Sequence, residues 1–342
     1  MPPLWNAAVY DNQAIVLGSG VCCDGFHRRS RTRVQTHVHS DHMLGFATSK
    51  GHGDIICLPG TYDLLIAKND SVTGPDLPFR SNFKAVESGS YVEVEDAKIQ
   101  LTRSDHMLGS AQVLVEHSDG YRTGYSGDFG WPTQPMEVDE LVLDGTSSPA
   151  TVRNYSREEA EASLLELAHE KVVIGPVLIW ADIESIYRGL ALLGSENRWP
   201  ILIDDRAAAY AEVYARHGLH IPPHVVVGTA EGLEIQNEGR YFHFKIKSSH
   251  SEEELTHSTK INLIPFRGSR DEPVFEYYEN YFEVGISNHA DFEQTVEYVS
   301  GTGAQRVLVD NTRSPGRAME VAHALQERLG IIASYETLRE DS

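Results

Sequence analysis

The residues best suited to chemistry form one short segment, HVHSDH at residues 37–42. It follows a β-rich run, so it lies where a strand gives way to a loop. Alternate residues of an extended chain point the same way, so His37 and His39 can hold one metal ion. Asp41 and His42 then turn into the loop and can serve a second ion. Imidazole and carboxylate ligands without thiolate suit Zn²⁺, with Mn²⁺ or Fe²⁺ as alternatives.

A pair of ions needs more ligands than this segment offers, and two later residues are candidates. His106 lies in SDHMLGSA at residues 104–111, and Asp128 lies in YSGDF at residues 125–129. Each is expected at the end of another strand. Either residue alone is more typical of a turn, but their order and spacing after the first segment make them candidate ligands.

Short strands dominate the first 150 residues and must position these side chains. The expected strands are Ala14–Leu17, Val34–His37, Ile55–Leu58, Tyr91–Val94, Lys98–Thr102, Gln112–Glu116 and Tyr121–Tyr125, with one helix near Thr61–Ala67. This pattern predicts a β-dominated domain with few helices.

From about Ser156 the pattern changes to alternating helices and strands. Ser156 and Glu159 form a capping box that opens a helix. The elements expected after it are a strand at 172–179, a helix around 183–193, a strand at 200–203 and a helix at 207–217. This alternation predicts an α/β unit with parallel strands. The first pattern returns with a strand at 282–286, a helix from Asp291, a strand at 306–309 and a helix after Pro315.

Composition narrows the class of protein. The chain has 342 residues, 41% of them hydrophobic, which predicts a packed core. Its longest apolar run, at 172–181, is too short for a membrane span, and the amino end has no signal-peptide pattern. Three cysteines cannot build a disulfide framework and suit a reducing cytoplasm. We therefore expect a cytoplasmic protein without a membrane segment.

The net charge is −21, the reverse of a typical nucleic-acid-binding protein. A local basic groove is nevertheless compatible with an acidic surface. A basic cluster at residues 27–33 contains Arg28, Arg29, Arg31 and Arg33. It could contact a phosphate backbone, or it could equally be a solvated loop.

The order HxHxDH, then His, then Asp resembles the ligand order of the metallo-β-lactamase superfamily. HMLGSA at 106–111, LVLDGT at 141–146 and GISNHAD at 285–291 are similar to elements of its β-CASP branch, the nucleic-acid-cleaving members. The chain most resembles the short β-CASP exonucleases associated with DNA ligases and the mRNA 3′-end processing factor-like nucleases. This resemblance implies a four-layer αββα metallo-β-lactamase domain at 1–150 and 284–342. A β-CASP-like α/β cap would occupy 151–283.

The resemblance also implies a role for each candidate residue. One zinc ion would be held by His37, His39, His106 and Asp128, and the other by Asp41, His42 and a bridging Asp128. Asp24, expected at the end of an early strand, would orient the ligand loop from behind.

The implied reaction is cleavage of a phosphodiester in single-stranded RNA or DNA. Two ions about 3.5–4 Å apart would polarise a phosphate oxygen and activate a water, which Asp41 can orient. His289, paired with Asp144, would protonate the leaving oxygen. A carboxylate beside an imidazole stabilises the protonated ring, which suits a general acid.

One position departs from the pattern. RNA-processing members have a histidine ligand after the last strand, where this chain has Asp310, or Asn311 if the register shifts by one residue. Asp310 could be a replacement ligand, or the second metal site could be weak. Two other functions also stay open, a catalytically silent subunit of a processing complex and a metallo-hydrolase of small substrates. The sequence leaves RNA versus DNA, endo- versus exonuclease action and the oligomeric state undecided.

Overall fold

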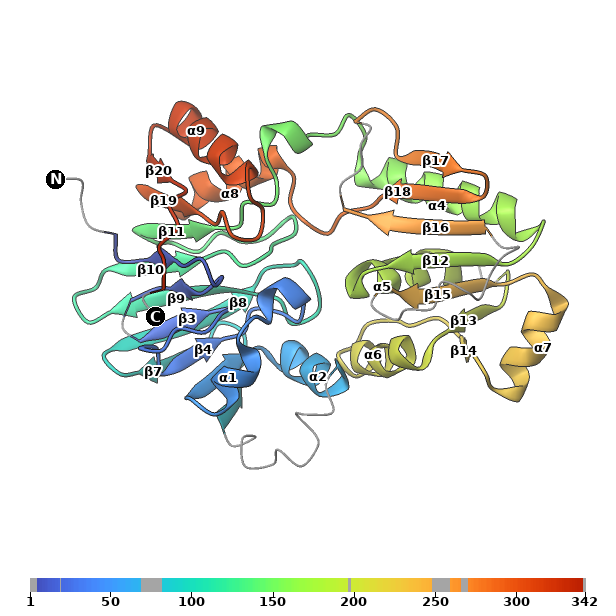
Figure 1. Ribbon diagram of the computed structural model, residues 1–342, viewed down its shortest axis with the longest axis horizontal. Coiled ribbons are helices and arrows are strands. Elements are labelled where there is room, and N and C mark those ends of the chain that lie inside the picture. The colour runs from blue at the N-terminus through green and yellow to red at the C-terminus, as the bar shows by residue number, and fades with distance from the viewer. Residues whose placement is uncertain are drawn as a thin grey trace. The chain divides into compact units, whose positions relative to one another are not determined.

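The computed structural model describes residues 5–18, 20–68, 82–195, 198–247, 259–265 and 270–340 (Figure 1). The chain divides into two units. Unit 1 comprises Met1–Val152 and His289–Ser342, and unit 2 comprises Arg153–Asn288. Both units combine strands and helices, so the mixed α/β fold class expected from the sequence is confirmed.

Unit 1 contains two sheets. The first sheet has the order β1 (Ala8–Val9), β2 (Ile15–Val16), β3 (Val21–Cys23), β4 (Thr32–Val34), β5 (Asp54–Cys57) and β6 (Phe83–Ala85). The second has the order β20 (Ile332–Ser334), β19 (Arg306–Val309), β11 (Glu140–Leu143), β10 (Arg122–Tyr125), β9 (Ala111–His117), β8 (Ala97–Arg103) and β7 (Tyr91–Val94). Strands β3 to β6 are parallel, as are β10, β11, β19 and β20. Parallel strands carry their following loops to one edge of a sheet, which matters for the site below.

The central strands β11 and β19 of the second sheet of unit 1 are buried on both faces. Val142 and Leu308 face a core that also contains Val34 and Ile56 of the first sheet, so this core lies between the two sheets. Their neighbours Leu141 and Val307 join the opposite core. This alternation follows from the period of two along a strand, and double burial explains why β11 and β19 read as continuous apolar runs.

Helices of unit 1 complete the packing. The unit contains η1 (Ser40–His42), α1 (Phe46–Lys50), α2 (Pro59–Lys68), η3 (Pro149–Thr151), α8 (Phe292–Thr302) and α9 (Arg317–Leu329). Helices α8 and α9 pack on the second sheet, where Val296 and Leu325 enter its outer core. Figure 1 shows these C-terminal helices, in red, beside β11, which comes from the middle of the chain.

Unit 2 is built around one sheet of seven strands. Its order is β14 (Val225–Val226), β13 (Ile201–Ile203), β15 (Phe242–Ile246), β12 (Val177–Ala181), β16 (Thr259–Ile264), β18 (Tyr281–Gly285) and β17 (Val274–Tyr278). All neighbouring pairs are parallel except β17 with β18. Its helices are α4 (Arg157–Val172), α5 (Ile183–Gly194), α6 (Asp205–Arg216) and α7 (Ala230–Glu238).

Capping residues in the sequence explain most helix starts in unit 2. The expected start of one strand, β12, was wrong. The capping box of Ser156 and Glu159 is present at the start of α4. The strand expected at 172–179 begins only at Val177, because α4 continues through Val172. Pro176 then separates helix from strand. Throughout the described ranges, no helix has both the length and the apolar character of a membrane span.

Candidate metal centre

Loops that follow strands of both sheets bring the candidate residues together in unit 1. The positioning strands are β3 and β4 in the first sheet and β10, β11 and β19 in the second, together with the antiparallel strand β8, which His106 follows. Asp24 follows β3, the segment 35–42 follows β4, and Asp128 follows β10. Asp144 and Asp310 directly follow β11 and β19.

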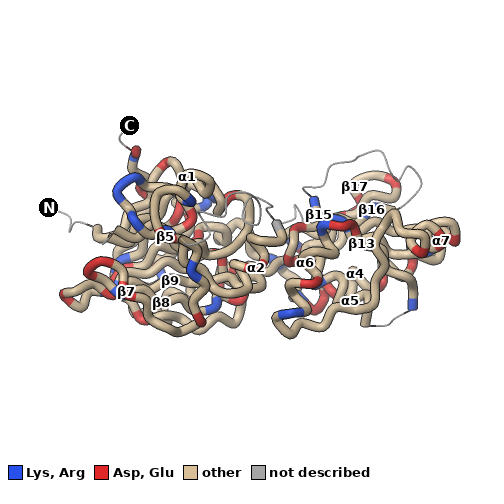
Figure 2. The backbone as a smooth tube through the Cα atoms, turned by 90° about the horizontal axis from the view of Figure 1, so that it is seen from below, with Lys and Arg blue, Asp and Glu red and all other residues tan. Residues whose placement is uncertain are grey.

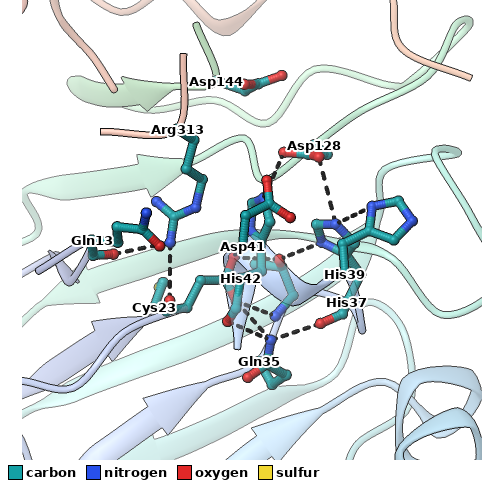
Figure 3. Close-up of polar contacts among 12 residues, drawn as sticks. Gln13, Cys23, Gln35, His37, His39, Asp41, His42, Asp128, Asp144 and Arg313 are labelled. Carbon is teal, nitrogen blue, oxygen red and sulfur yellow. Dashed lines mark hydrogen bonds and ion pairs between the residues drawn. The ribbon is translucent and has the colours of Figure 1, made fainter. Parts of the chain in front are cut away.

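Three imidazoles and one carboxylate converge at this edge, those of His37, His39, His106 and Asp128. Figure 3 shows His37, His39 and Asp128 of this group. His39 Nδ1 lies 3.1 Å from His37 Nε2 and 3.3 Å from His106 Nε2. Asp128 Oδ2 lies 3.5 Å from His37 Nε2 and 3.7 Å from His106 Nε2. A tetrahedral ion with bonds of about 2.0–2.1 Å has ligand atoms about 3.3 Å apart. Four of the six distances among these ligand atoms therefore match the spacing in one metal site, and all four atoms lie within 4.8 Å of one another.

A second group shares His37 and contains Asp24 and His42. His42 Nδ1 lies 2.8 Å from Asp24 Oδ2, and because a carboxylate only accepts, the ring nitrogen donates. His42 Nε2 is buried without a hydrogen bond and lies 3.1 Å from Asp128 Oδ1. Two acceptors at that distance need a cation between them, either a proton or a metal ion.

A hydrogen-bond relay orients His37 in the same way. The Thr36 hydroxyl donates to Asp24 Oδ2, so its oxygen accepts from His37 Nδ1 at 2.9 Å. His37 Nε2 is then unprotonated and faces the cluster. Buried carboxylates behind ligand histidines fix the ring tautomer in this manner. The residues present therefore fit a metal ion.

Electrostatics supports the same assignment. Burial, reinforced by His42, holds the pKa of His37 well below its ordinary value, so this ring is neutral and available as a ligand. Burial alone would also lower the pKa of His42, but Asp128 and Asp24 override it and raise the pKa to about 10. Burial alone would raise the pKa of Asp128, yet His42 and His37 hold it well below its ordinary value. Without a metal, a proton on His42 satisfies the carboxylates.

The remaining sequence-predicted residues lie around this cluster. The Asp41 side chain is half-exposed, with Oδ2 3.8 Å from His42 Nε2. His289 packs its ring against His106, with centroids 4.4 Å apart. Its Nδ1 lies 3.7 Å from Asp144 Oδ2, while Asp144 Oδ1 accepts from the Thr146 amide and hydroxyl. Burial, followed by the charge of Asp128, raises the pKa of Asp144.

Asp310 is not among the side chains clustered at either group within the described residues. Its Oδ2 pairs with Arg313 Nη1 at 2.6 Å, and its Oδ1 accepts from the Thr312 amide and hydroxyl. Both carboxylate oxygens are engaged away from the cluster, so the structure does not bring Asp310 to the metal ligands.

One arginine of the basic cluster at 27–33, Arg33, supports the fold. Its guanidinium is buried and donates to the carbonyl oxygens of Gly25, His42 and Leu44 and to the Ser49 hydroxyl. It thus ties the ligand loop to the first sheet and cannot contact a phosphate backbone. Gln35 acts similarly, donating to the His37 and His42 carbonyls. No sequence pattern marks either role.

Comparisons with known proteins place this geometry in a family. No protein-family model matches the sequence. The chain is 30% identical over 138 residues to an uncharacterized protein in the lig 3′ region of Acidianus ambivalens, covering 39% of this chain and 99% of that protein. It is 26% identical over 323 residues to a probable DNA ligase of Opitutus terrae, covering 88% of this chain. It is 26% identical over 153 residues, 41% of this chain, to the 5′ exonuclease Apollo of Danio rerio.

These relatives and the clustered histidines and aspartates decide the family. The chain belongs to the metallo-β-lactamase superfamily, in its β-CASP branch.

This β-CASP chain covers only part of two of its relatives, and its fold resembles that of one solved structure. The chain spans only 28% of the length of the ligase relative and 27% of Apollo. A solved structure of a protein of unknown function from Enterococcus faecalis V583 has a similar fold, with a TM-score of 0.60 and 12% identity. That likeness covers 91% of this β-CASP chain and 80% of the other chain.

Proposed function

We propose that this protein is a metal-dependent nuclease that hydrolyses phosphodiester bonds. Unit 1 would be the αββα metallo-β-lactamase sandwich and unit 2 its β-CASP cap. The observation that carries the proposal is the cluster of four ligand atoms within 4.8 Å of one another, in which Asp24 orients the ring of His37 through Thr36. The exonuclease named among its relatives supports the same reaction class.

The donor set favours Zn²⁺, with Mn²⁺ as an alternative. His37, His39, His106 and Asp128 would hold the first ion, and Asp41, His42 and Asp128 would hold a second, weaker one. When bound, such ions polarise a phosphate oxygen and lower the pKa of a water toward neutrality.

The chain's own residues would handle the proton on the leaving oxygen. Asp144 Oδ2 lies 3.7 Å from His289 Nδ1 and would orient the ring, which would leave Nε2 for the substrate. Because the Asp144 carboxylate stabilises a protonated imidazole, His289 can carry the proton that the leaving alkoxide needs. Asp41, half-exposed beside His42, would accept a hydrogen bond from the attacking water.

Two of the relatives support DNA as the substrate class. The relative that spans most of this chain is a probable DNA ligase, and another lies in a lig 3′ region. We therefore propose single-stranded DNA, with RNA as the second candidate. The three buried free thiols, Cys22, Cys23 and Cys57, support a reducing cytoplasmic location.

The test is cleavage of matched, end-labelled single-stranded DNA and RNA with Zn²⁺ or Mn²⁺. Wild type is compared with Asp41→Asn, which removes one half-exposed carboxylate of the site, and with Asp119→Asn in an exposed turn between β9 and β10. We expect Asp41→Asn to abolish cleavage and Asp119→Asn to retain it.

The product ladder would distinguish endo- from exonuclease action and give the direction. Wild-type protein with bound metal that cleaves neither strand would overturn the nuclease proposal. That result would favour a silent subunit or a hydrolase of small substrates. Equal cleavage by Asp41→Asn would show that the reaction occurs elsewhere.

A further inference from the structure

Arg313 is a buried cation beside the proposed metal centre (Figure 3). Arg313 follows β19 and lies 289 positions after Asp24 in the sequence. Its side chain is 3% exposed. Its Nη1 donates to Asp310 Oδ2 at 2.6 Å. Its Nη2 donates to two backbone carbonyl oxygens, those of Gln13 and Asp24, at 2.9 Å each. One planar guanidinium therefore joins three separate segments of unit 1.

The two carbonyls that Arg313 contacts belong to residues with unusual backbone geometry. Gln13 has φ +67° and Asp24 has φ +49°, both in the left-handed region that side-chain-bearing residues rarely adopt. The segments also meet closely, because a Cβ on Gly25 would lie 2.4 Å from Ala14 Cα. Such conformations persist where surrounding contacts determine them, and the bridging guanidinium is such a contact.

The conformation of Asp24 determines where its carboxylate lies. That carboxylate accepts from His42 Nδ1 and from the Thr36 hydroxyl, which in turn accepts from His37 Nδ1. A change in the backbone at Asp24 would move both hydrogen bonds that fix the ligand rings.

We propose that Arg313 is a positioning residue for the metal centre, holding Asp24 in its left-handed conformation with Asp310 as the counter-ion of the guanidinium. This inference rests on the proposed metal site. It assigns Asp310 the task of supporting Arg313 instead of binding metal. Arginine suits the position because its planar fork serves a carboxylate and two carbonyls at once, whereas a lysine ammonium cannot reach all three in this geometry.

The experiment measures metal affinity and ring tautomers, independently of nuclease activity. Zn²⁺ affinity is determined by competition with a chromophoric chelator for wild type, Arg313→Lys and the double variant Arg313→Met/Asp310→Asn. The double variant removes both buried charges, so neither is left unpaired. Long-range ¹H–¹⁵N NMR on the metal-free proteins shows which nitrogen of His37 carries the proton. Arg328→Met, which breaks an exposed pair with Glu293, is the matched control.

We expect Zn²⁺ affinity to fall by about 10- to 100-fold in both Arg313 variants, as for other outer partners of metal ligands. The single Nδ1-protonated form of His37 should give way to a mixture, and Arg328→Met should match wild type. Folded Arg313 variants with wild-type affinity and tautomers would overturn the inference, even if their melting temperature fell. Wild type that binds no Zn²⁺ would instead overturn the metal-site proposal itself.

Discussion

Replacing Thr36 with valine should weaken the metal centre while leaving the side-chain volume almost unchanged. The Thr36 hydroxyl is fully buried, donates to Asp24 Oδ2 and accepts from His37 Nδ1. A hydrogen bond to a charged group contributes about 1.5–3 kcal/mol. Asp24 keeps the Thr36 amide and His42 Nδ1 as donors, so the loss is partly compensated. We expect the metal-free protein to lose about 2 kcal/mol of unfolding free energy.

The effect on metal binding follows from His37. Without the Thr36 oxygen, Nδ1 loses its acceptor, and the ring can exchange tautomers or rotate. Losing such an outer partner typically costs about 10- to 100-fold in metal affinity, equivalent to about 1.4–2.8 kcal/mol. The assay is Zn²⁺ competition with a chromophoric chelator, together with urea unfolding of the metal-free protein.

Thr295→Val is the matched control. Thr295 is buried in α8, and its hydroxyl donates to the Asp291 carbonyl, away from the cluster. This variant should lose about 1 kcal/mol of stability without any change in Zn²⁺ affinity. If Thr36→Val bound Zn²⁺ as tightly as Thr295→Val, the relay through Thr36 would have no part in orienting His37.

Three further predictions test the site and the core. Zn²⁺ binding at pH 8 should release about one proton if the second ion binds His42, because Asp128 and Asp24 outweigh the effect of burial and raise the pKa of that ring to about 10. Calorimetry in buffers of different ionisation enthalpy would detect this proton release. It would detect no proton release if His42 does not bind the ion. His289→Ala should slow single-turnover cleavage by about 10²- to 10⁴-fold at unchanged Zn²⁺ content, and loss of bound Zn²⁺ instead would contradict its role as a proton donor. Burial, then Asp63, raises the pKa of Cys57 from 9.0 to about 12, so its protonated thiol supports the fold below pH 9 and this contribution is lost as pH rises toward 12. Unfolding free energy should then fall by about 1.4 kcal/mol per pH unit from this thiol, a slope that Cys57→Ala should remove.

The ligand candidates were accessible from sequence because their residue types are themselves the signal. Histidine and aspartate at strand ends are uncommon in a packed core, and the structure brings His37, His39, His106 and Asp128 to within 4.8 Å of one another. What sequence could not supply is the support behind them. Arg33 and Arg313 are ordinary residue types, and their partners lie up to 300 positions away in the chain. Only the folded arrangement of the two sheets creates those contacts.

Unit 2 was harder to predict for a different reason. Within the described part of residues 218–281, five elements were not predicted from the sequence, namely β14, α7, β15, β16 and β17. Strand β15 reads FHFKI, which alternates like a half-exposed strand, yet it lies inside the sheet with His243 and Lys245 buried. Polar residues in a fully buried strand obscure the apolar run that normally identifies one.

Charge explains how an acidic protein could act on a polyanion. Figure 2 shows acidic and basic residues interspersed in both units, in keeping with a net charge of −21. At the centre itself, the two buried arginines already donate to backbone and side-chain acceptors of the fold. Four carboxylates stand at the centre, those of Asp24, Asp41, Asp128 and Asp144, while Asp310 is paired with Arg313. Without metal, this centre would repel a phosphate. Two divalent ions would supply four positive charges there and reverse the local field. On the proposed function, metal binding therefore prepares the site to attract its substrate as well as to cleave it.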